Sequence, residues 1–282
     1  MSPDEKMHVN KLLENARESL VTHKPLTHRH AIPVTQILRY AASIALLIGF
    51  GFLGGLLIAD IPSNIKTSEI FVSRGSRANI TLPDGSMVWL GHESSLSYPE
   101  KFFGSSREVT LTGEAFFDVE SDENHPFLVH TSGPTIRVTG TEFYVHDYPS
   151  DPMMETSLVT GKIDLLLNKR LLSKMQPGSK LVYMKQSGKL LAGDFEASYY
   201  EFWKKGEYSF IDKPFSELAS MMQRIYNVEI IFGNNELKEK RFTGSMGSDD
   251  NVYTLLEIFK KSSSANFNYS IDNNKIYVTT KK

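Results

Sequence analysis

Apolar residues recur along the chain with three different patterns, and each pattern predicts a different kind of structure. Near the N-terminus they lie three or four positions apart, which is typical of one face of a helix. An uncharged run then extends from Tyr40 to Ala59. From residue 68 onward, short runs alternate between apolar and polar residues, which indicates β-strands. The apolar positions of the first helix are Val9, Leu12, Leu13, Ala16 and Leu20.

The uncharged run from Tyr40 to Ala59 is long enough to cross a membrane. About twenty helical residues at about 1.5 Å each span roughly 30 Å, the thickness of the hydrocarbon core of a bilayer. Arg39 precedes the run, and Asp60 and Pro62 end it. A cleavable signal peptide is the alternative, but its apolar region would be shorter and a cleavage site between small residues should follow. We therefore expect a single transmembrane helix over residues 40–59.

We predict the orientation of this helix from the lengths of chain on its two sides rather than from the flanking charges. Lysine and arginine flank the run in equal number, so the positive-inside rule does not decide. Most of the 282 residues follow the run. That arrangement favours a cytoplasmic N-terminus and an exported C-terminal body. The flanking residues are Lys24, Arg29 and Arg39 before the run, and Lys66, Arg74 and Arg77 after it.

The segment from residue 68 to 200 reads as an all-β domain. Many short strands separated by turn residues, such as Pro83-Asp84-Gly85, predict a β-sandwich or β-roll. In the clearest strand, one predicted core face carries Leu111, Gly113, Ala115, Phe117 and Val119. The other face is predicted to be solvated, and it carries Thr110, Thr112, Glu114, Phe116, Asp118 and Glu120. We also expect Trp89 in the core.

The segment from residue 201 to 282 changes pattern and predicts a small α/β domain. Two strand–helix–strand units follow one another, and a final strand completes a βαβ-βαββ order. We expect two helices on one sheet. The last strand, Ile276–Thr279, is a candidate edge strand that could pair with a partner through Ile276 and Val278. Nearby lysines would also suit ordinary protection of an edge, and both interpretations stay open.

Composition narrows the function classes. The chain is 40% hydrophobic and 23% charged with a net charge of -2, which is ordinary for a globular protein and lacks the basic excess of a nucleic-acid binder. It contains no cysteine, which excludes disulfides, thiolate metal sites and cysteine nucleophiles.

No catalytic constellation emerges from the sequence. Glu114 and Asp118 lie on one strand face but about 13 Å apart, whereas a glycosidase pair requires roughly 5–9.5 Å. His92 and Glu93 are adjacent, and adjacent strand residues point to opposite faces. His23, His28 and His30 have no carboxylate or cysteine among them to complete a metal site. We therefore expect no enzyme activity, no cofactor and no metal.

Several short segments in order resemble the FecR family of inner-membrane anti-sigma regulators, in the form common in Bacteroidetes. The segments from 207 onward resemble the family's C-terminal domain, which looks like the secretin/TonB short N-terminal fold. The matching segments are Leu82–Ser86 with Val88–Leu90, Ser95–Pro99, Arg107–Val109, Leu111–Val119, Pro126-Phe127, Val138–Phe143, Pro177-Gly178, Trp203-Lys204 and Arg224–Val228.

This resemblance implies a signalling relay. The exported part would sense a TonB-dependent outer-membrane transporter through the signalling domain of that transporter. The cytoplasmic tail would bind an extracytoplasmic-function (ECF) sigma factor that controls nutrient-uptake genes, and Leu12, Leu13 and Leu20 are the candidate contacts. The family usually carries a longer cytoplasmic helical domain with tryptophan, whereas this tail has one predicted helix. The expected division is 1–39 tail, 40–59 transmembrane helix, 60–67 linker, 68–200 β domain and 201–282 C-terminal domain.

Two other classes of protein remain alternatives. One is a membrane-tethered periplasmic carbohydrate-binding or glycan-processing module, which would need a cluster of exposed aromatic rings near carboxylates. The other is an envelope scaffold that does not signal. A neighbouring gene for a sigma factor or a TonB-dependent receptor would favour the signalling relay over both.

Overall fold

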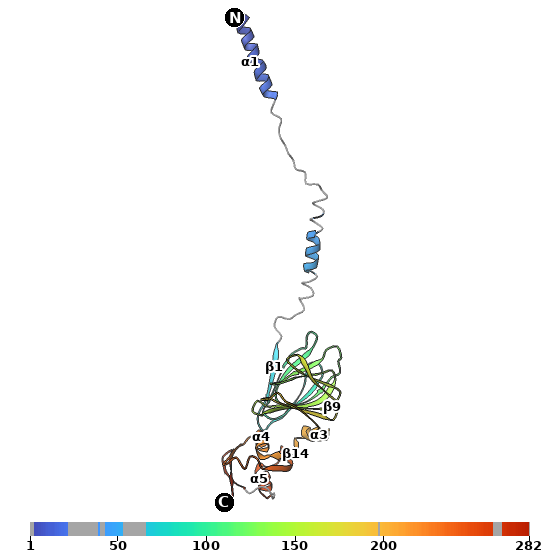
Figure 1. Ribbon diagram of the computed structural model, residues 1–282, viewed down its shortest axis with the longest axis vertical. Helices are drawn as coiled ribbons and strands as arrows, with labels where there is room; N and C mark the ends of the chain where they lie inside the picture. The colour runs from blue at the N-terminus through green and yellow to red at the C-terminus, as the bar shows by residue number, and fades with distance from the viewer. Residues whose placement is uncertain are drawn as a thin grey trace. The chain divides into compact units, whose positions relative to one another are not determined.

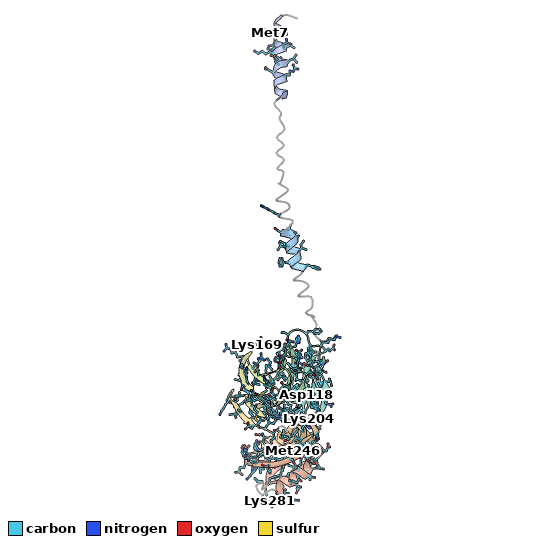
Figure 2. The ribbon with its side chains drawn as sticks, turned by 90° about the vertical axis from the view of Figure 1, so that its right-hand side faces the viewer. Met7, Asp118, Lys169, Lys204, Met246 and Lys281 are labelled. Atoms are coloured by element: carbon cyan, nitrogen blue, oxygen red, sulfur yellow. The ribbon has the colours of Figure 1, made fainter. Side chains whose placement is uncertain are left out.

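The structure is a computed structural model that describes residues 3–21, 39, 43–52, 66–196, 198–261 and 267–281 (Figure 1). The chain divides into two compact units, Met1–Asp60 and Ile61–Lys282. Figure 2 labels Asp118 and Lys169 in the β-rich part of the second unit, and Met246 and Lys281 in its C-terminal part.

The first unit contains the predicted N-terminal helix. Helix α1 spans Pro3–Val21, and Leu12 and Leu13 on it are 59% and 61% exposed. Residues 43–52 are also helical. Among the described residues, no helix combines the length and the apolar character that a membrane crossing requires. Residues 40–42 and 53–59 of the predicted transmembrane segment lie outside the described residues.

The second unit begins with a β domain, and the prediction of β-rich structure here is confirmed. Its 13 strands form one continuous sheet. The strands are β1 (Thr67–Val72), β2 (Ala78–Thr81), β3 (Met87–Leu90), β4 (Ser94–Pro99), β5 (Arg107–Val119), β6 (Phe127–His130), β7 (Thr135–Val138), β8 (Thr141–Asp147), β9 (Met153–Thr160), β10 (Ile163–Leu167), β11 (Arg170–Met175), β12 (Ser179–Met184) and β13 (Leu190–Asp194).

Strand β5 joins two layers of this sheet. Its first half pairs with β4 and β6, and its second half pairs with β3 and β8. The change of layer falls at Gly113, whose φ is 102°. A Cβ there would lie 2.3 Å from Ser94 Oγ. Glycine is therefore required both for the backbone conformation and for the close approach of β4.

The core between the two layers is centred on Phe117, as predicted. Its side chain is fully buried and stacks on Phe143 with ring centroids 5.0 Å apart. Trp89 was expected in the same core, and that prediction is wrong. Val88 pairs with Phe117, whereas Trp89 pairs with Phe116 on the opposite face and is only partly buried. Strand side chains alternate between faces, so one residue of register decides which of the two enters the core.

The C-terminal part of the second unit has the predicted βαβ-βαββ order, preceded by a helix that the sequence did not predict. That helix is α3 (Ser198–Lys205). The remaining elements are β14 (Glu207–Pro214), α4 (Phe215–Tyr226), β15 (Glu229–Phe232), β16 (Arg241–Gly247), α5 (Val252–Lys261), β17 (Phe267–Asp272) and β18 (Lys275–Thr280). We call α3–β18 the C-terminal domain.

The described residues of this domain form two small sheets rather than the single sheet expected. The strands that precede the helices, β14 and β16, pair with each other, and the strands that follow form the order β15-β18-β17. Phe215 at the start of α4 joins the two sheets into one core. Its ring lies 5.1 Å from Phe232 of β15 and 5.1 Å from Phe242 of β16.

The expectation that Ile276 and Val278 lie on an edge strand is wrong. Strand β18 pairs in parallel with β15 and antiparallel with β17, so it is the central strand of its sheet. Both side chains are completely buried. The alternating pattern of β18 predicts one buried face, but it does not reveal that a strand preceding it in the sequence pairs with its other side.

Candidate functional site: the junction between the two domains

The C-terminal domain packs on the outer face of β5 and its neighbours. Tyr200 and Trp203 of α3 lie with their rings 4.8 and 5.4 Å from the ring of Tyr144 on β8. Tyr200 also contacts Phe116 of β5 at 5.9 Å. The ammonium of Lys204 lies 4.5 Å over the Phe116 ring. These aromatic side chains share one hydrophobic cluster with the core of the C-terminal domain.

Helix α3 is held in place by an arginine from the β domain. Arg77 Nη2 donates hydrogen bonds to the carbonyl oxygens of Trp203 at 2.6 Å and Lys204 at 2.9 Å. Its guanidinium lies 5.2 Å from the centre of the Trp203 ring. A cation at the C-terminus of a helix satisfies carbonyl groups that have no partner within the helix and interacts favourably with the helix dipole.

A network of charged and hydrogen-bonding side chains crosses the junction beside this aromatic cluster. Tyr144 donates to Glu114 Oε2 at 2.7 Å, and His146 Nδ1 lies 3.8 Å from the same oxygen. His146 Nε2 contacts Asp151 Oδ2 at 2.8 Å. Asp151 Oδ1 then accepts a hydrogen bond from Arg224 Nη2 of α4 at 2.5 Å. This network of side chains therefore links a strand of the β domain to a helix of the C-terminal domain.

Arg224 is the residue through which this network of side chains reaches the C-terminal domain. Its guanidinium lies 3.7 Å from the centre of the Tyr148 ring, and its Nε is 3.9 Å from Glu93 Oε2. Glu93 is also paired with Arg74 at 2.8 Å. The backbone oxygen of Arg224 accepts from the amide of Gly75 at 2.8 Å. Both the side chain and the main chain of this residue therefore contact the β domain.

The charges in the junction stabilise one another. Burial alone would lower the pKa of His146, but the hydrogen bond to Asp151 and the nearby carboxylate of Glu114 outweigh it and raise the pKa to about 9. Burial would raise the pKa of Asp151, yet His146 and Arg224 hold it well below its ordinary value. The pKa of buried Glu114 is likewise lowered, since His146 and Tyr144 outweigh its desolvation. At neutral pH Glu114 and Asp151 are therefore negatively charged, and their charges are balanced by those of His146 and Arg224.

The structure corrects the predicted environment of Glu114. It was expected on a solvated strand face, and it is buried. Thr110, Thr112, Asp118 and Glu120 on the same predicted face are exposed, as expected. The C-terminal domain covers only the middle of this face. Phe116, an apolar residue within a polar face, was the signal in the sequence that something packs there.

The other sequence candidates do not form a common site. His92 is buried in a turn, where its pKa is lowered mainly by burial, and Glu93 beside it adopts a left-handed conformation with φ 53°. Leu12 and Leu13 are exposed on α1, and the side chain of Leu20 lies outside the described residues. Asp151 and Arg224 were not identified as functional residues from sequence. The signals in the sequence that pointed toward this junction were Phe116 and the family-like segments that contain Trp203 and Arg224.

The fold and the junction define a class of protein: a β domain whose outer face is closed by a small α/β domain. Two family models match these parts in order. The FecR protein model matches residues 68–164, and the model for the C-terminal domain of FecR matches residues 207–278. The chain belongs to the FecR family of anti-sigma factors. It is therefore a protein of signal transduction, with a sigma factor as its general kind of partner.

Solved structures agree with this assignment. Two crystal structures of a candidate anti-sigma factor from Parabacteroides distasonis ATCC 8503 are similar to the chain. Each is 27% identical with a TM-score of 0.70. The alignments cover 76% and 77% of this chain and 100% of the crystallised chain. Among curated proteins, none matches the chain.

Proposed function

We propose that this chain is a single-pass inner-membrane regulator that relays the state of a TonB-dependent outer-membrane transporter to an ECF sigma factor. Residues 40–59 form the membrane anchor, the N-terminus is cytoplasmic, and the Ile61–Lys282 unit lies in the periplasm. The C-terminal domain receives the signal from the transporter's signalling domain. The output is transcription of nutrient-uptake genes.

The observation that carries this proposal is the exposed leucine face of α1. Leu12 and Leu13 lie on neighbouring positions of one face and are 59% and 61% exposed. An amphipathic helix of this kind binds by laying its apolar face into a groove of a partner. Since the family acts on sigma factors, this face is the candidate contact for one.

The junction supports the other half of the relay. Arg224 and Asp151 form a hydrogen-bonded ion pair between the two domains, with their side chains 7% and 15% exposed. A partner that displaces the C-terminal domain must break this contact or move the β domain with it. A partner's effect on α4 is therefore transmitted to strands β5 and β8.

The proposal assigns no catalytic step to the chain. Glu114, the carboxylate closest to an acid–base arrangement, is held by Tyr144 and lies beside His146 beneath the C-terminal domain. The aromatic rings of Tyr144, Tyr200 and Trp203 are buried in the same place. They therefore do not form the exposed aromatic surface that the carbohydrate-binding alternative requires.

The decisive experiment is a pull-down of the sigma factor encoded beside this gene, with the full-length chain in detergent as bait. We expect the wild-type chain to capture it, and Leu12→Asp with Leu13→Asp to lose the capture, because charged side chains cannot enter an apolar groove. Lys11→Asp on the same helix is the matched control, since it adds the same charge without removing an apolar contact. Capture that survives the double substitution would contradict the assignment of this face.

A further inference from the structure

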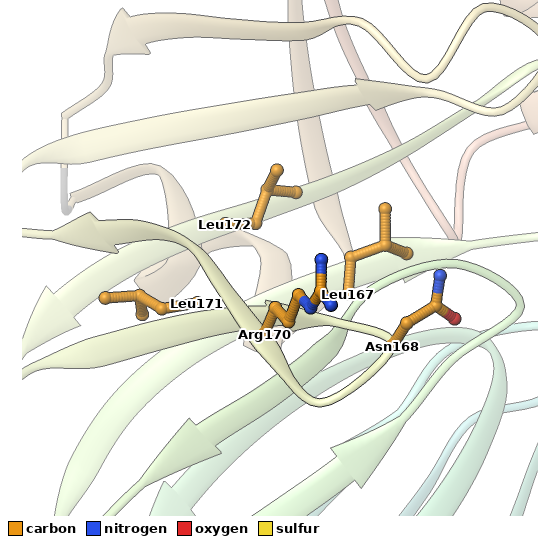
Figure 3. A pocket seen from close by; sticks show the side chains of 5 residues that line it. All are labelled: Leu167, Asn168, Arg170, Leu171 and Leu172. Carbon is orange, nitrogen blue, oxygen red and sulfur yellow. The ribbon is translucent and has the colours of Figure 1, made fainter.

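The hairpin that joins β10 to β11 carries two exposed leucines beside two exposed cations. Leu171 and Leu172 are 53% and 37% exposed, and Lys169 and Arg170 directly precede them and are exposed as well. Figure 3 shows the two leucine side chains pointing in different directions from the hairpin. Consecutive strand residues point to opposite faces. Since both are exposed, neither face of the hairpin end is covered by the rest of the domain.

The turn of this hairpin places a cation at its tip. Asn168 and Lys169 have φ values of 51° and 64°. Two consecutive left-handed residues define the type I′ turn, whose second position glycine fits with least strain. Here lysine occupies that position. From Leu165 to Gln176 the sequence contains the basic residues Lys169, Arg170 and Lys174 and no acidic residue, although the whole chain has a net charge of -2.

The hairpin lies at the end of its unit where the chain enters. Figure 2 places Lys169 at the end of the Ile61–Lys282 unit opposite Lys281. Figure 1, which shares the same vertical axis, shows β1 entering the β domain at that end. Glu100 donates its amide to the carbonyl of Lys66 at 3.0 Å, so the loop after β4 begins beside this entry point. Phe103 in that loop is 50% exposed.

The length of the chain before β1 brings this end close to a membrane. This step rests on the proposed function, in which residues 40–59 are the anchor. The chain from Ala59 to Lys66 can reach at most about 25 Å even when fully extended. The end of the unit that carries the hairpin is therefore tethered within a short distance of the lipid surface.

We propose that the β10–β11 hairpin docks on the periplasmic leaflet of the membrane that holds the anchor. Leu171 and Leu172 enter the boundary between headgroups and acyl chains, and Lys169 and Arg170 contact the phosphates of anionic lipids. Apolar side chains flanked by cations are the chemistry of interfacial membrane binding, and long basic side chains reach the headgroups while their stems stay in apolar surroundings. Docking fixes the orientation of the β domain, so that the C-terminal domain faces away from the membrane.

The test uses the absence of cysteine from the chain, which lets a single introduced cysteine carry an environment-sensitive fluorophore. Full-length protein with Leu171→Cys is reconstituted into vesicles of phosphatidylcholine and phosphatidylglycerol that contain a lipid-attached quencher. Insertion of about 5–10 Å brings the label within reach of a shallow quencher. Ile211→Cys, at a site on β14 that is 80% exposed, is the matched control. We expect quenching at residue 171 and none at residue 211.

A charge reversal tests the electrostatic part of the proposal. Lys169→Glu with Arg170→Glu, made in the Leu171→Cys protein, should reduce docking on anionic vesicles by about fivefold for each basic charge lost. On vesicles of phosphatidylcholine alone the reversal should have little effect. Both side chains are exposed, so we expect the two substitutions to leave the fold unchanged. Equal quenching before and after the reversal on anionic vesicles would overturn the role of the two cations.

Vesicle flotation distinguishes a failure of the proposed membrane anchor from a failure of the proposed hairpin docking. A chain that does not float with the vesicles would overturn the proposed anchor and this inference together. A chain that floats but shows equal quenching at residues 171 and 211 would overturn the inference alone. Strand β11 is also a sheet edge that could pair with a second copy. Fluorescence at residue 171 that depends on protein density and not on the quencher would identify that contact and overturn lipid docking.

Discussion

Arg224 of helix α4 donates a hydrogen bond to Asp151 of the β domain at 2.5 Å. With side chains 7% and 15% exposed, the pair is shielded from water, and Asp151 is also bound to His146. Removing either partner would leave the other charge buried with fewer opposite charges beside it. This ion pair is one of the contacts that hold the two domains together, and its burial makes it the first target for mutation.

We predict that Arg224→Ala destabilises the chain by about 3–5 kcal/mol, the usual result of breaking a buried ion pair. The matched control is Arg241→Ala. It breaks a pair with Asp212 in which the side chains are 52% and 70% exposed, and it should change stability by about 1 kcal/mol or less. Urea unfolding of the full-length protein in detergent measures both. Similar values for the two variants would show that the junction pair is solvated.

We predict that the junction weakens in mild alkali. The pKa of His146 is raised from 6.5 to about 9 in the folded protein. A raised pKa contributes stability that is fully present below pH 6.5 and is lost as the pH rises through about 9. The shift corresponds to about 3 kcal/mol. Unfolding midpoints measured from pH 6 to 9.5 should fall in the wild type and stay nearly level in His146→Gln, and parallel curves would rule out this histidine as the cause.

In acid, Asp151 makes the stability of the protein depend on pH in the opposite direction. The pKa of Asp151 lies below its usual value of 3.8. Its contribution is therefore present above about pH 4 and is lost as the pH falls below that value. Because His146 and Asp151 bind each other, the two contributions are one interaction seen from either side, and they should not be added. Asp151→Asn should remove the acid dependence and reduce the alkaline one, since Glu114 still raises the pKa of His146.

We predict that Gly113→Ala is far more harmful than Gly104→Ala. Both glycines have positive φ, 102° and 84°, so both substitutions carry backbone strain. Only at Gly113 would the new Cβ collide, at 2.3 Å from Ser94 Oγ and 2.8 Å from Ser94 Cα. At Gly104 no atom lies within 4 Å. The difference between the two melting temperatures isolates the collision, and equal losses would mean that β4 can move away at little cost.

The sequence predicted the strands and helices well because their patterns are local. Alternation placed Phe117 in the core, and spacing at three and four residues placed α4 and α5. It failed where the environment comes from distant residues. Glu114 was predicted to be solvated because the residues that cover that face, Tyr200 and Trp203, lie far away in the sequence. Phe116 signals a contact there, but it does not identify what makes that contact. Ile276 was assigned to an edge because β18 pairs with β15, a strand that precedes it in the sequence by two strands and a helix (β16, α5 and β17).

The candidate site was harder to predict than the fold for the same reason. Asp151 lies in an ordinary turn, and its role depends on an arginine from another domain. Arg224 does not fall on the apolar stripe of α4 formed by Leu218, Met222 and Ile225. A buried ion pair between domains has no periodic signature. It becomes visible only when both partners are placed in space.

The last prediction tests whether the junction transmits a signal. Arg224→Ala should uncouple transcription from the inducing nutrient in a reporter strain, because a partner's effect on the C-terminal domain no longer reaches β5 and β8. The same variant should still pull down the sigma factor, since α1 is unchanged. Deleting residues 207–282 is a poorer experiment, because it would remove most of the hydrophobic cluster that Tyr200 and Trp203 share, and exposed rings of this kind favour aggregation. Arg241→Ala again serves as the control and should respond normally. If Arg224→Ala retained a normal response while losing stability as predicted, the junction would be a structural contact, and the signal would travel by another route.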